Sequence, residues 1–291
     1  MTRLPETLTN LPWYLPSIGP MLTPECQELL SDYAQVPTEK HEMYIYEARD
    51  DAFATFPLGT IGEFWFLVLG LSEHPFYGTL LNRLRNALDP YSPVLVDLGT
   101  CLGQDLRKLV HDGASPRQLL GIDKFPQFAE IGFSFFRDSE KMNGRFLTAD
   151  VFEHDESDAL NETKGTWEVV TSSMFLHSFD WETQKVAVRK MFELARAKDS
   201  WLMGLMGGDL EEQDVPILPP LVPENVRVSR FIHSTTSLSR LLMEVGHELG
   251  RTITVHTSYQ EDKESTYTKA LAESYFASGK ARLLFYFVEI L

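Results

Sequence analysis

The chain has 291 residues, of which 43% are hydrophobic and 23% are charged, so it can bury a substantial core. Its 26 basic residues against 42 acidic ones give a formal net charge of −16, which disfavours nucleic acid as a partner. The longest apolar run, FWFLVLGL at 64–71, is far too short for a membrane span.

The cellular compartment follows from the cysteines and from the N-terminal stretch. Cys26 and Cys101 are the only cysteines, too few for a disulfide-stapled secreted domain. The N-terminal stretch MTRLPETLTNLPWYL lacks the apolar run of a signal peptide. These features predict an intracellular, cytoplasmic protein without a membrane span.

Residues 1–90 are expected to form an N-terminal helical cap packed on a sheet. Prolines are dense at the start of this segment, and short amphipathic pieces follow. An aromatic cluster then extends from residue 53 to residue 77, and most of its rings are expected to be core. At least one ring, with Trp65 as the candidate, is expected to face a ligand cleft or an oligomer partner, which leaves a homodimer open.

Residues 91–291 alternate apolar runs with helical patterns, which predicts an α/β core on a mainly parallel sheet covered on both faces. Strands are expected at 94–98, 118–123, 145–151, 167–173 and 201–207. Amphipathic helices are expected at 102–110, 125–136 and 181–195. Two late strands, at 252–259 and 283–291, have no convincing long crossover helix between them, which favours an antiparallel terminal pair.

The stretch GGDLEEQDVPILPPLVPENV at 207–226 is acidic and rich in proline. It follows the carboxyl end of an expected strand, and open α/β sheets bind their ligands at that edge. A loop this long inside a compact domain is usually functional or disordered. We therefore expect residues 207–235 to form a loop on the ligand side.

The stretch VLVDLGTCLGQDLRKLV at 94–110 predicts a strand, a tight turn and a helix. The turn satisfies neither the dinucleotide fingerprint Gly-x-Gly-x-x-Gly nor the phosphate loop, which ends in Gly-Lys-Ser/Thr. Gly99 and Gly103 are expected where the backbone approaches a ligand closely, because glycine has no side chain to obstruct it. The turn therefore predicts a binding site that is built for something other than a diphosphate.

Three successive strands end in an aspartate. Asp97 ends the first strand, and Asp123 ends the second, where a carboxylate can accept hydrogen bonds from the two hydroxyls of a ribose. Asp150 ends the third, with Val151 and Phe152 placed to meet the edge and the face of a base. Three acids suit a ligand with a ribose, an amine and a positive centre. S-adenosylmethionine has that composition and NAD does not.

The remaining expected cofactor contacts come from the turn and from two strand ends. Thr100 is expected to contribute its backbone N–H, and Gln104 either pairs with the methionine carboxylate or faces solvent. Cys101 is expected to be a small buried residue, because no histidine accompanies it in a nucleophile motif. The set is completed by Lys124, Phe125 and Ser172.

Two histidines are candidates for the acceptor side of the site. His177, in SSMFLHSF, either takes a proton from a hydroxyl acceptor as the catalytic base or hydrogen-bonds a backbone carbonyl. His233, in RFIHSTTSLSRLL, precedes an expected helix N-cap and is the weaker candidate for a substrate contact. The acidic residues at 211, 212 and 214 are expected to lie in a solvated loop, and no metal is predicted.

These motifs resemble those of the class I S-adenosylmethionine-dependent methyltransferases over roughly residues 90–291. Their first motif is usually an acid followed by Gly-x-Gly-x-Gly, and here Cys101 replaces the middle glycine. A closer resemblance, to the fungal meroterpenoid methyltransferases, covers nearly the whole chain. The segments that carry it are TFPLGTIGEFWFLVLGLSEHPFY, DLGTCLGQDLRKLVHDGAS, GIDKFPQFAEIGFSFFRD and FLTADVF.

The resemblance implies a seven-stranded Rossmann-like methyltransferase sheet, mostly parallel with an antiparallel last strand, beneath an N-terminal cap that serves as an acceptor lid. It implies a small hydrophobic acceptor, and members of that group notably form a methyl ester on prenylated aromatic polyketide acids. Acceptor contacts do not transfer, because those positions vary with substrate. The cofactor contacts that it carries over at their motif positions are Asp97, Gly99, Gly103, Asp123 and Asp150.

Three alternatives to ester formation stay open at this point. The enzyme could methylate a hydroxyl or carbon acceptor, or it could be a cyclase or isomerase that retains the cofactor without transferring its methyl group. A ligand-binding regulator is the third alternative, and the acids at three strand ends weaken it, because they indicate that the cofactor still binds.

Overall fold

The computed structural model describes residues 4–87, 89, 91–153, 159–217, 222–261, 265–276 and 280–291. Within these ranges a seven-stranded sheet has the order β3-β2-β1-β4-β5-β9-β8, and a separate ribbon pairs β6 with β7. The strands are β1 (Leu95–Leu98), β2 (Leu119–Asp123), β3 (Phe146–Thr148), β4 (Val169–Ser173), β5 (Ser200–Asp209), β6 (Gln213–Ile217), β7 (Val228–Ile232), β8 (Ile253–Tyr259) and β9 (Ala281–Ile290).

The pairing of the strands confirms the predicted fold class. The pairs β2–β3, β1–β4 and β4–β5 are parallel, whereas β5–β9 and β8–β9 are antiparallel. Each predicted strand has a counterpart in the sheet. The third is shorter than its predicted range 145–151, because the chain turns after Thr148 and the Asp150 carboxylate accepts the Phe152 N–H at 3.0 Å.

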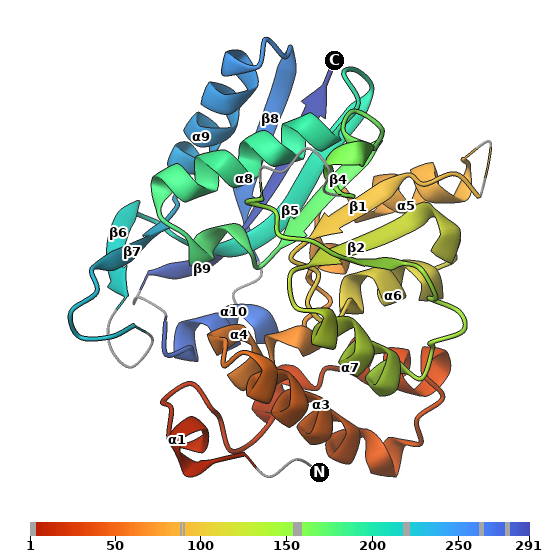
Figure 1. Cartoon of the computed structure of the whole chain (residues 1–291), viewed down its shortest axis with the longest axis vertical. Helices are drawn as coiled ribbons and strands as arrows, with labels where there is room; N and C mark the ends of the chain where they lie inside the picture. The colour runs from red at the N-terminus through yellow and green to blue at the C-terminus, as the bar shows by residue number, and fades with distance from the viewer. Residues whose placement is uncertain are drawn as a thin grey trace. The chain divides into compact units, whose positions relative to one another are not determined.

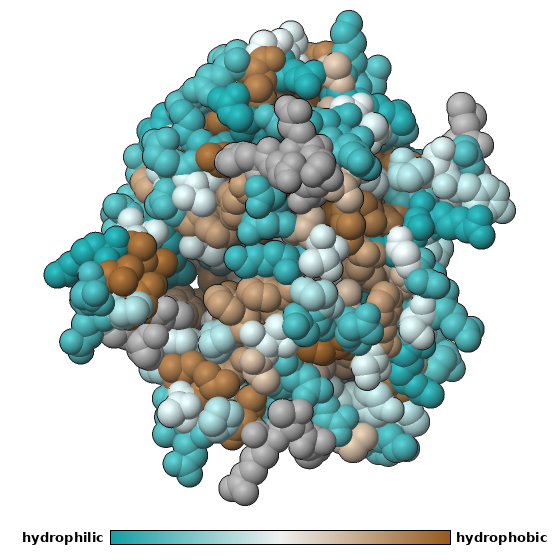
Figure 2. All heavy atoms as spheres, in the orientation of Figure 1, coloured by the Kyte–Doolittle hydropathy of each residue, from teal (hydrophilic) through white to brown (hydrophobic). Residues whose placement is uncertain are grey.

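The segment 207–235 differs from the predicted loop. β5 extends to Asp209, and β6 and β7 pair antiparallel, with Pro216 opposite Ser229. Both strands of a two-stranded ribbon are edge strands, which tolerate proline, so the Pro-rich composition concealed the strands. Figure 2 shows an apolar patch over this ribbon, where Val226 and Val228 are exposed. Residues 218–221 of the predicted loop lie outside the described residues.

The chain divides into two compact units, and the first comprises Met1–Pro93, Thr100–Thr148 and Glu273–Phe276. In this unit α7 packs against α3 and against β2 and β3, and α6 packs on β2. The fully buried rings of Phe53, Phe64 and Phe128 belong to its core. That residues 1–90 act as an acceptor lid stays a prediction. Its longer helices are α3 (His41–Thr55), α5 (Tyr77–Arg85), α6 (Gln104–His111) and α7 (Pro126–Phe136).

Short helical segments complete the first unit. The α-helical ones are α1 (Glu6–Thr9), α2 (Pro24–Glu28) and α4 (Gly59–Gly62), and the π-helical turn η2 (Leu29–Tyr33) continues α2. The 3₁₀ turns are η1 (Gly19–Met21), η3 (Thr38–Lys40), η4 (Trp65–Leu67), η5 (Gly70–Glu73) and η6 (Pro116–Gln118). At η2 the helix widens, and Tyr33 at its end is buried with its ring against that of Phe136.

The second unit comprises Val94–Gly99, Ala149–Ala272 and Ala277–Leu291. Its strands β5 and β9 pair along their whole length, from Ser200 opposite Ile290 to Asp209 opposite Ala281. Figure 1 shows α8 and α9 side by side, and Lys185 of α8 joins them by donating to Glu244 at 2.6 Å. Its helices are α8 (Trp181–Leu194), α9 (Thr235–Glu248) and α10 (Thr266–Glu273), with turns η7 (Asn161–Thr163) and η8 (Leu176–Ser178).

No helix within the described ranges combines the length and the apolar character that crossing a membrane requires.

Candidate functional site

The turn that follows β1 is built from left-handed backbone conformations. Gly99, Cys101 and Gly103 have φ angles of +71°, +50° and +71°. A Cβ on Gly103 would lie 2.6 Å from the Phe146 ring, so this position has no room for a side chain. Cys101 stands where the family motif has glycine, and a left-handed conformation costs such a residue about 1–2 kcal/mol. The turn is held in a conformation that its sequence does not favour locally.

Asp123 is the residue that holds this turn in the first unit. Its Oδ2 accepts the backbone N–H of Cys101 at 3.0 Å, and its Oδ1 accepts that of Phe125 at 3.1 Å. Burial is the largest influence on its pKa, which lies above the usual value despite these N–H donors. Each carboxylate oxygen keeps a second lone pair, so the same group can still accept from ligand hydroxyls. The sequence predicted the ligand role and missed the role in the turn.

A small pocket opens beside Asp123 in the first unit. Four of the predicted cofactor contacts line it together with apolar residues. One of the four, Phe125, also stacks on Phe56, with ring centroids 4.9 Å apart. The Lys124 ammonium lies 5.4 Å from the Phe125 ring. The pocket lining is Thr100, Cys101, Asp123, Phe125, Pro126, Ala129, Phe146, Leu147 and Thr148.

In the second unit, the predicted strand-end acids are engaged with the protein. Asp97 is buried, and its Oδ1 accepts the Thr171 hydroxyl at 2.7 Å. Asp150 accepts the Phe152 N–H, and the Phe152 ring lies 4.9 Å from that of Phe179. Val151 between them is buried. Asp97 therefore binds a side chain of the neighbouring strand, Asp150 holds the backbone at its own strand end, and the contact of both acids with a cofactor stays a prediction.

Sequence analysis missed Phe175, which follows β4 in the second unit. A Cβ on Gly99 would lie 2.4 Å from the Phe175 ring, so this ring explains why the position requires glycine. Phe175 also packs on Phe179, with centroids 5.0 Å apart. In the sequence this ring lies two positions before His177, in the stretch SSMFLHSF.

Buried polar atoms without a hydrogen-bond partner are concentrated at predicted site positions. In the first unit these atoms are Thr100 Oγ1 and Gln104 Oε1, and in the second they are Ser172 Oγ and His177 Nδ1. Buried polar groups are normally paired, so each unpaired atom requires an explanation. S-adenosylmethionine, with its amino acid and ribose, carries polar groups that fit such atoms. The described residues contain three further atoms of this kind, on His41, Ser173 and Thr254.

His177 lies in η8 and is buried. Burial lowers the pKa of its imidazole from 6.5 to about 3, and the positive charge of Arg230 acts in the same direction. The ring is therefore neutral at physiological pH. A general base works best when its pKa lies near the operating pH, so His177 is better suited to hydrogen bonding than to proton abstraction.

Trp65 and His233, the other predicted substrate contacts, are buried and hydrogen-bonded within the protein. The Trp65 side chain is buried, and its Nε1–H donates to Glu63 Oε2 at 3.0 Å. His233 is 0% exposed, with Nδ1 2.9 Å from Ser237 Oγ and Nε2 3.0 Å from Gln184 Oε1. Both side chains satisfy their polar atoms inside the protein, and their contact with a substrate stays a prediction.

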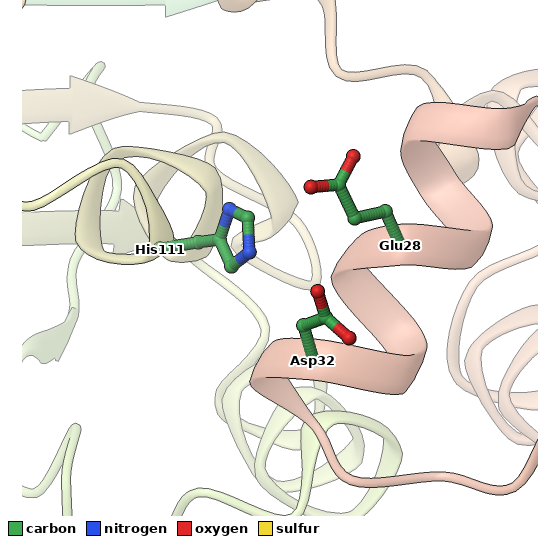
Figure 3. Close-up of side chains that lie close together, drawn as sticks. All are labelled: Glu28, Asp32 and His111. Atoms are coloured by element: carbon green, nitrogen blue, oxygen red, sulfur yellow. The ribbon is translucent and has the colours of Figure 1, made fainter.

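One group of residues in the described ranges could hold a metal ion, namely Glu28, Asp32 and His111. Their candidate ligand atoms lie within 4.8 Å of one another, and Figure 3 shows the imidazole pointing toward both carboxylates. Glu28 and Asp32 are exposed, and His111 ends α6, whereas the turn precedes that helix. Exposed acidic groups come this close in many proteins without a metal, so the arrangement does not assign one.

The acidic run after β5 is partly neutralised. Lys280 donates to Glu211 Oε1 at 2.7 Å, and Arg240 donates to Glu212 Oε1 at 3.2 Å. These exposed ion pairs explain how a run of acids is tolerated next to the β6–β7 ribbon.

The family model and the relatives that match this chain are all named as methyltransferases. The family described as "Meroterpenoid methyltransferase N-terminal domain" matches residues 13–67. The O-methyltransferase phiE of a fungal species (strain ATCC 74256) is 34% identical over 249 residues, which cover 85% of this chain and 78% of that protein. The O-methyltransferase atr3 of Stereocaulon alpinum is 32% identical over 285 residues, which cover 97% and 78%.

Among solved structures, the geranyl diphosphate C-methyltransferase of Streptomyces coelicolor A3(2) aligns over 73% of this chain and 78% of that chain. Its TM-score is 0.46 and its sequence identity 12%. The relatedness of the chain to known proteins therefore rests on the sequence matches.

Proposed function

This chain belongs to the fungal meroterpenoid methyltransferases, which use S-adenosylmethionine, and we propose that it forms a methyl ester on the carboxylate of a hydrophobic meroterpenoid or related polyketide intermediate. The relatives phiE and atr3 are both O-methyltransferases by name. The relative nvfJ of Aspergillus novofumigatus, 33% identical over 168 residues, is named for the methylation of asnovolin E and chermesin D.

We assign the cofactor to the residues whose polar atoms lack partners and to the acids at the strand ends. In the first unit, Asp123 is assigned to the ribose hydroxyls, and Thr100 and Gln104 to the amino-acid end. In the second unit, Asp150 and Phe152 are assigned to the adenine. When bound, S-adenosylmethionine supplies a methyl group on a sulfonium, and the thioether that leaves needs no acid.

The choice of a carboxylate acceptor rests on the surroundings of His177. Its Nδ1 is buried and unpaired, and the positive charge of Arg230 acts on its ring. A phenol or an alcohol must lose a proton on methylation, and an imidazole of such low basicity is a poor acceptor for it. A carboxylate is already ionised at pH 7, because its pKa lies near 4. An imidazole nitrogen that is open to a hydrogen bond, with a positive charge acting on its ring, suits an anionic acceptor.

With such an acceptor, the protein contributes to the rate by positioning and by excluding water. The attacking oxygen has to lie about 3–3.5 Å from the methyl carbon in line with the leaving sulfur. Removing water from an ionised carboxylate raises its reactivity toward the sulfonium methyl group. No residue of the chain needs to carry a proton through the reaction.

The test is an assay with methyl-labelled S-adenosylmethionine and a set of prenylated aromatic polyketide acids, each paired with its amide analogue. We expect label to enter the acids but not the amides, and mild alkali to release it as methanol. Label that resists alkali would overturn the ester and indicate a hydroxyl or carbon acceptor. Conversion of the acid without label would indicate a cyclase or isomerase.

A further inference from the structure

A buried ion pair in the first unit is connected to the turn between β1 and α6. Arg107, on α6, is 0% exposed. Its Nη1 donates to the carbonyl oxygens of Leu102 at 2.5 Å and Gly103 at 3.3 Å. Its Nε and Nη2 donate to the two carboxylate oxygens of Asp138, at 2.8 and 2.9 Å. One guanidinium therefore joins the backbone of the turn to the segment that follows α7.

The same carboxylate also binds the N-terminal helices. The Tyr33 hydroxyl, in η2, donates to Asp138 Oδ2 at 2.7 Å. Burial and the Asp138 charge raise the pKa of Tyr33, so its hydroxyl keeps its proton and remains a donor. The contacts thus run from Tyr33 through Asp138 and Arg107 to the carbonyls of Leu102 and Gly103.

Packing gives this chain of contacts little freedom. The Arg107 guanidinium lies 4.5 Å from the centroid of the Phe136 ring and 5.0 Å from that of Phe146. A Cβ on Gly132 would lie 2.6 Å from the Leu102 carbonyl oxygen, so α7 meets the backbone of the turn directly. A movement of Arg107 therefore requires the turn to move with it.

Stability alone does not explain such a group. A buried ion pair costs much of its Coulombic gain in desolvation, and apolar replacements of similar volume are often as stable. The planar guanidinium nevertheless binds the Asp138 carboxylate along one edge and backbone carbonyl oxygens along another. It therefore fixes the position of the carbonyls relative to the carboxylate. The benefit of such an arrangement is orientation, and the atoms oriented here are those of the turn.

We propose that Tyr33, Asp138 and Arg107 act as positioning residues that set the turn for cofactor binding, so that the N-terminal helices contribute to cofactor affinity without touching the cofactor. This inference rests on the proposed role of the turn as part of the cofactor site. It adds residues that neither the family motif nor the acids at the strand ends include. Removing the Tyr33 hydroxyl should therefore change the position of the backbone at Leu102 and Gly103.

The test compares Tyr33→Phe with a matched control, Tyr77→Phe. The Tyr77 hydroxyl donates to Asp112 Oδ2 at 2.7 Å, in the same unit and just beyond the C-terminal end of α6. Each variant removes one hydroxyl from one carboxylate, so both should lower the melting temperature by a few degrees. We expect only Tyr33→Phe to weaken S-adenosylhomocysteine binding in calorimetry, by about three- to tenfold.

Kinetics provide the second readout, with acceptor at saturation. For Tyr33→Phe we expect a raised KM for S-adenosylmethionine with kcat within about twofold of wild type, because ground-state binding is what the turn supplies. Arg107→Lys should retain more affinity than Arg107→Met, since lysine keeps the charge but lacks the fork. Circular dichroism of each variant checks that it folds.

The outcomes separate the two proposals. Wild-type protein that fails to bind S-adenosylhomocysteine would overturn the cofactor assignment and, with it, this inference. Wild-type binding together with equal affinities in the Tyr33→Phe and Tyr77→Phe variants would overturn the positioning role alone.

Discussion

Two histidines of the second unit, His177 and His233, are both buried, but they differ in their hydrogen-bond partners. Burial lowers the pKa of each from 6.5 to about 3, so both rings are neutral. His233 has Ser237 and Gln184 on its two nitrogens, whereas the Nδ1 of His177 is buried without a partner. A complete set of partners indicates a structural role, and a missing partner indicates a place for a ligand.

The hydrogen bonds of Gln184 indicate what His233 does in the structure. Its Nε2 already donates to the carbonyls of Phe179 and Phe231, at 2.9 and 2.8 Å. Its Oε1 is therefore left to accept from the imidazole, which joins α8, β7 and the start of α9. Among the described residues the His177 Nδ1 has no hydrogen-bond partner, and the positive charge of Arg230 acts on its ring. The two histidines should consequently respond differently to every test of stability and activity.

The largest expected effect is on the pH dependence of stability. In the unfolded chain each histidine takes up a proton near pH 6.5, but in the folded protein it does so only near pH 3. The unfolded state therefore binds more protons between these values, and the free energy of unfolding falls as the pH falls below 6.5. Together the two groups should remove roughly 4 kcal/mol between pH 7 and pH 5.

Urea unfolding at pH 7 and pH 5 measures this loss in the wild type and in His177→Leu and His233→Leu. Each variant should remove roughly half of the histidine contribution. Variants whose unfolding free energy has the wild-type pH dependence would contradict the burial of neutral rings in the folded protein.

The second effect is on stability at pH 7, where the same two variants separate the histidines. His233→Leu leaves Gln184 Oε1 without its partner, whereas the Ser237 hydroxyl keeps its contacts with Ser234. It should therefore cost about 1–3 kcal/mol of unfolding free energy. His177→Leu leaves no group unpaired among the described residues and should cost less than about 1 kcal/mol. Denaturation curves decide this, and equal losses would remove the distinction between the two sites.

The third effect concerns the acceptor and sharpens the assignment of the His177 region. Arg230→Gln removes the positive charge that acts on His177, and we expect a rise of about tenfold in KM for an acid acceptor. The KM for S-adenosylmethionine should change by less than twofold. Initial rates at varied acceptor concentration measure this, with Arg189→Gln on the exposed side of α8 as the control. An unchanged acceptor KM would argue against an anionic acceptor near Arg230.

The sequence predicted the sheet better than it predicted the site. Apolar runs and helical periodicity located β1 to β5, β8 and β9, because burial imposes those patterns directly. The sequence did not predict the two strands of the β6–β7 ribbon, because the prolines and acidic residues of this segment are typical of a loop. Arg107 and Asp138 are 31 residues apart, and a charged pair buried at that separation leaves no local pattern.

The two histidines also show that contacts between residues distant in the sequence cannot be predicted from local patterns. Both follow a strand and precede a helical segment near aromatic residues, so their sequence contexts are alike. What separates them is Gln184, which is 49 residues from His233 in the chain. Asp123 was located by its place at a strand end, but its hold on the N–H of Cys101 became visible only in the folded turn.

The most direct test of the proposed chemistry is the pH profile of kcat/KM for the wild type and for His177→Gln, measured with a carboxylic acid acceptor. If the acceptor is an ionised carboxylate, the wild-type rate is flat between about pH 6 and 8, and the variant loses less than about tenfold. A wild-type rate that rises steeply through this range, together with a loss of about 10²–10⁴-fold and a flat profile in the variant, would contradict the account.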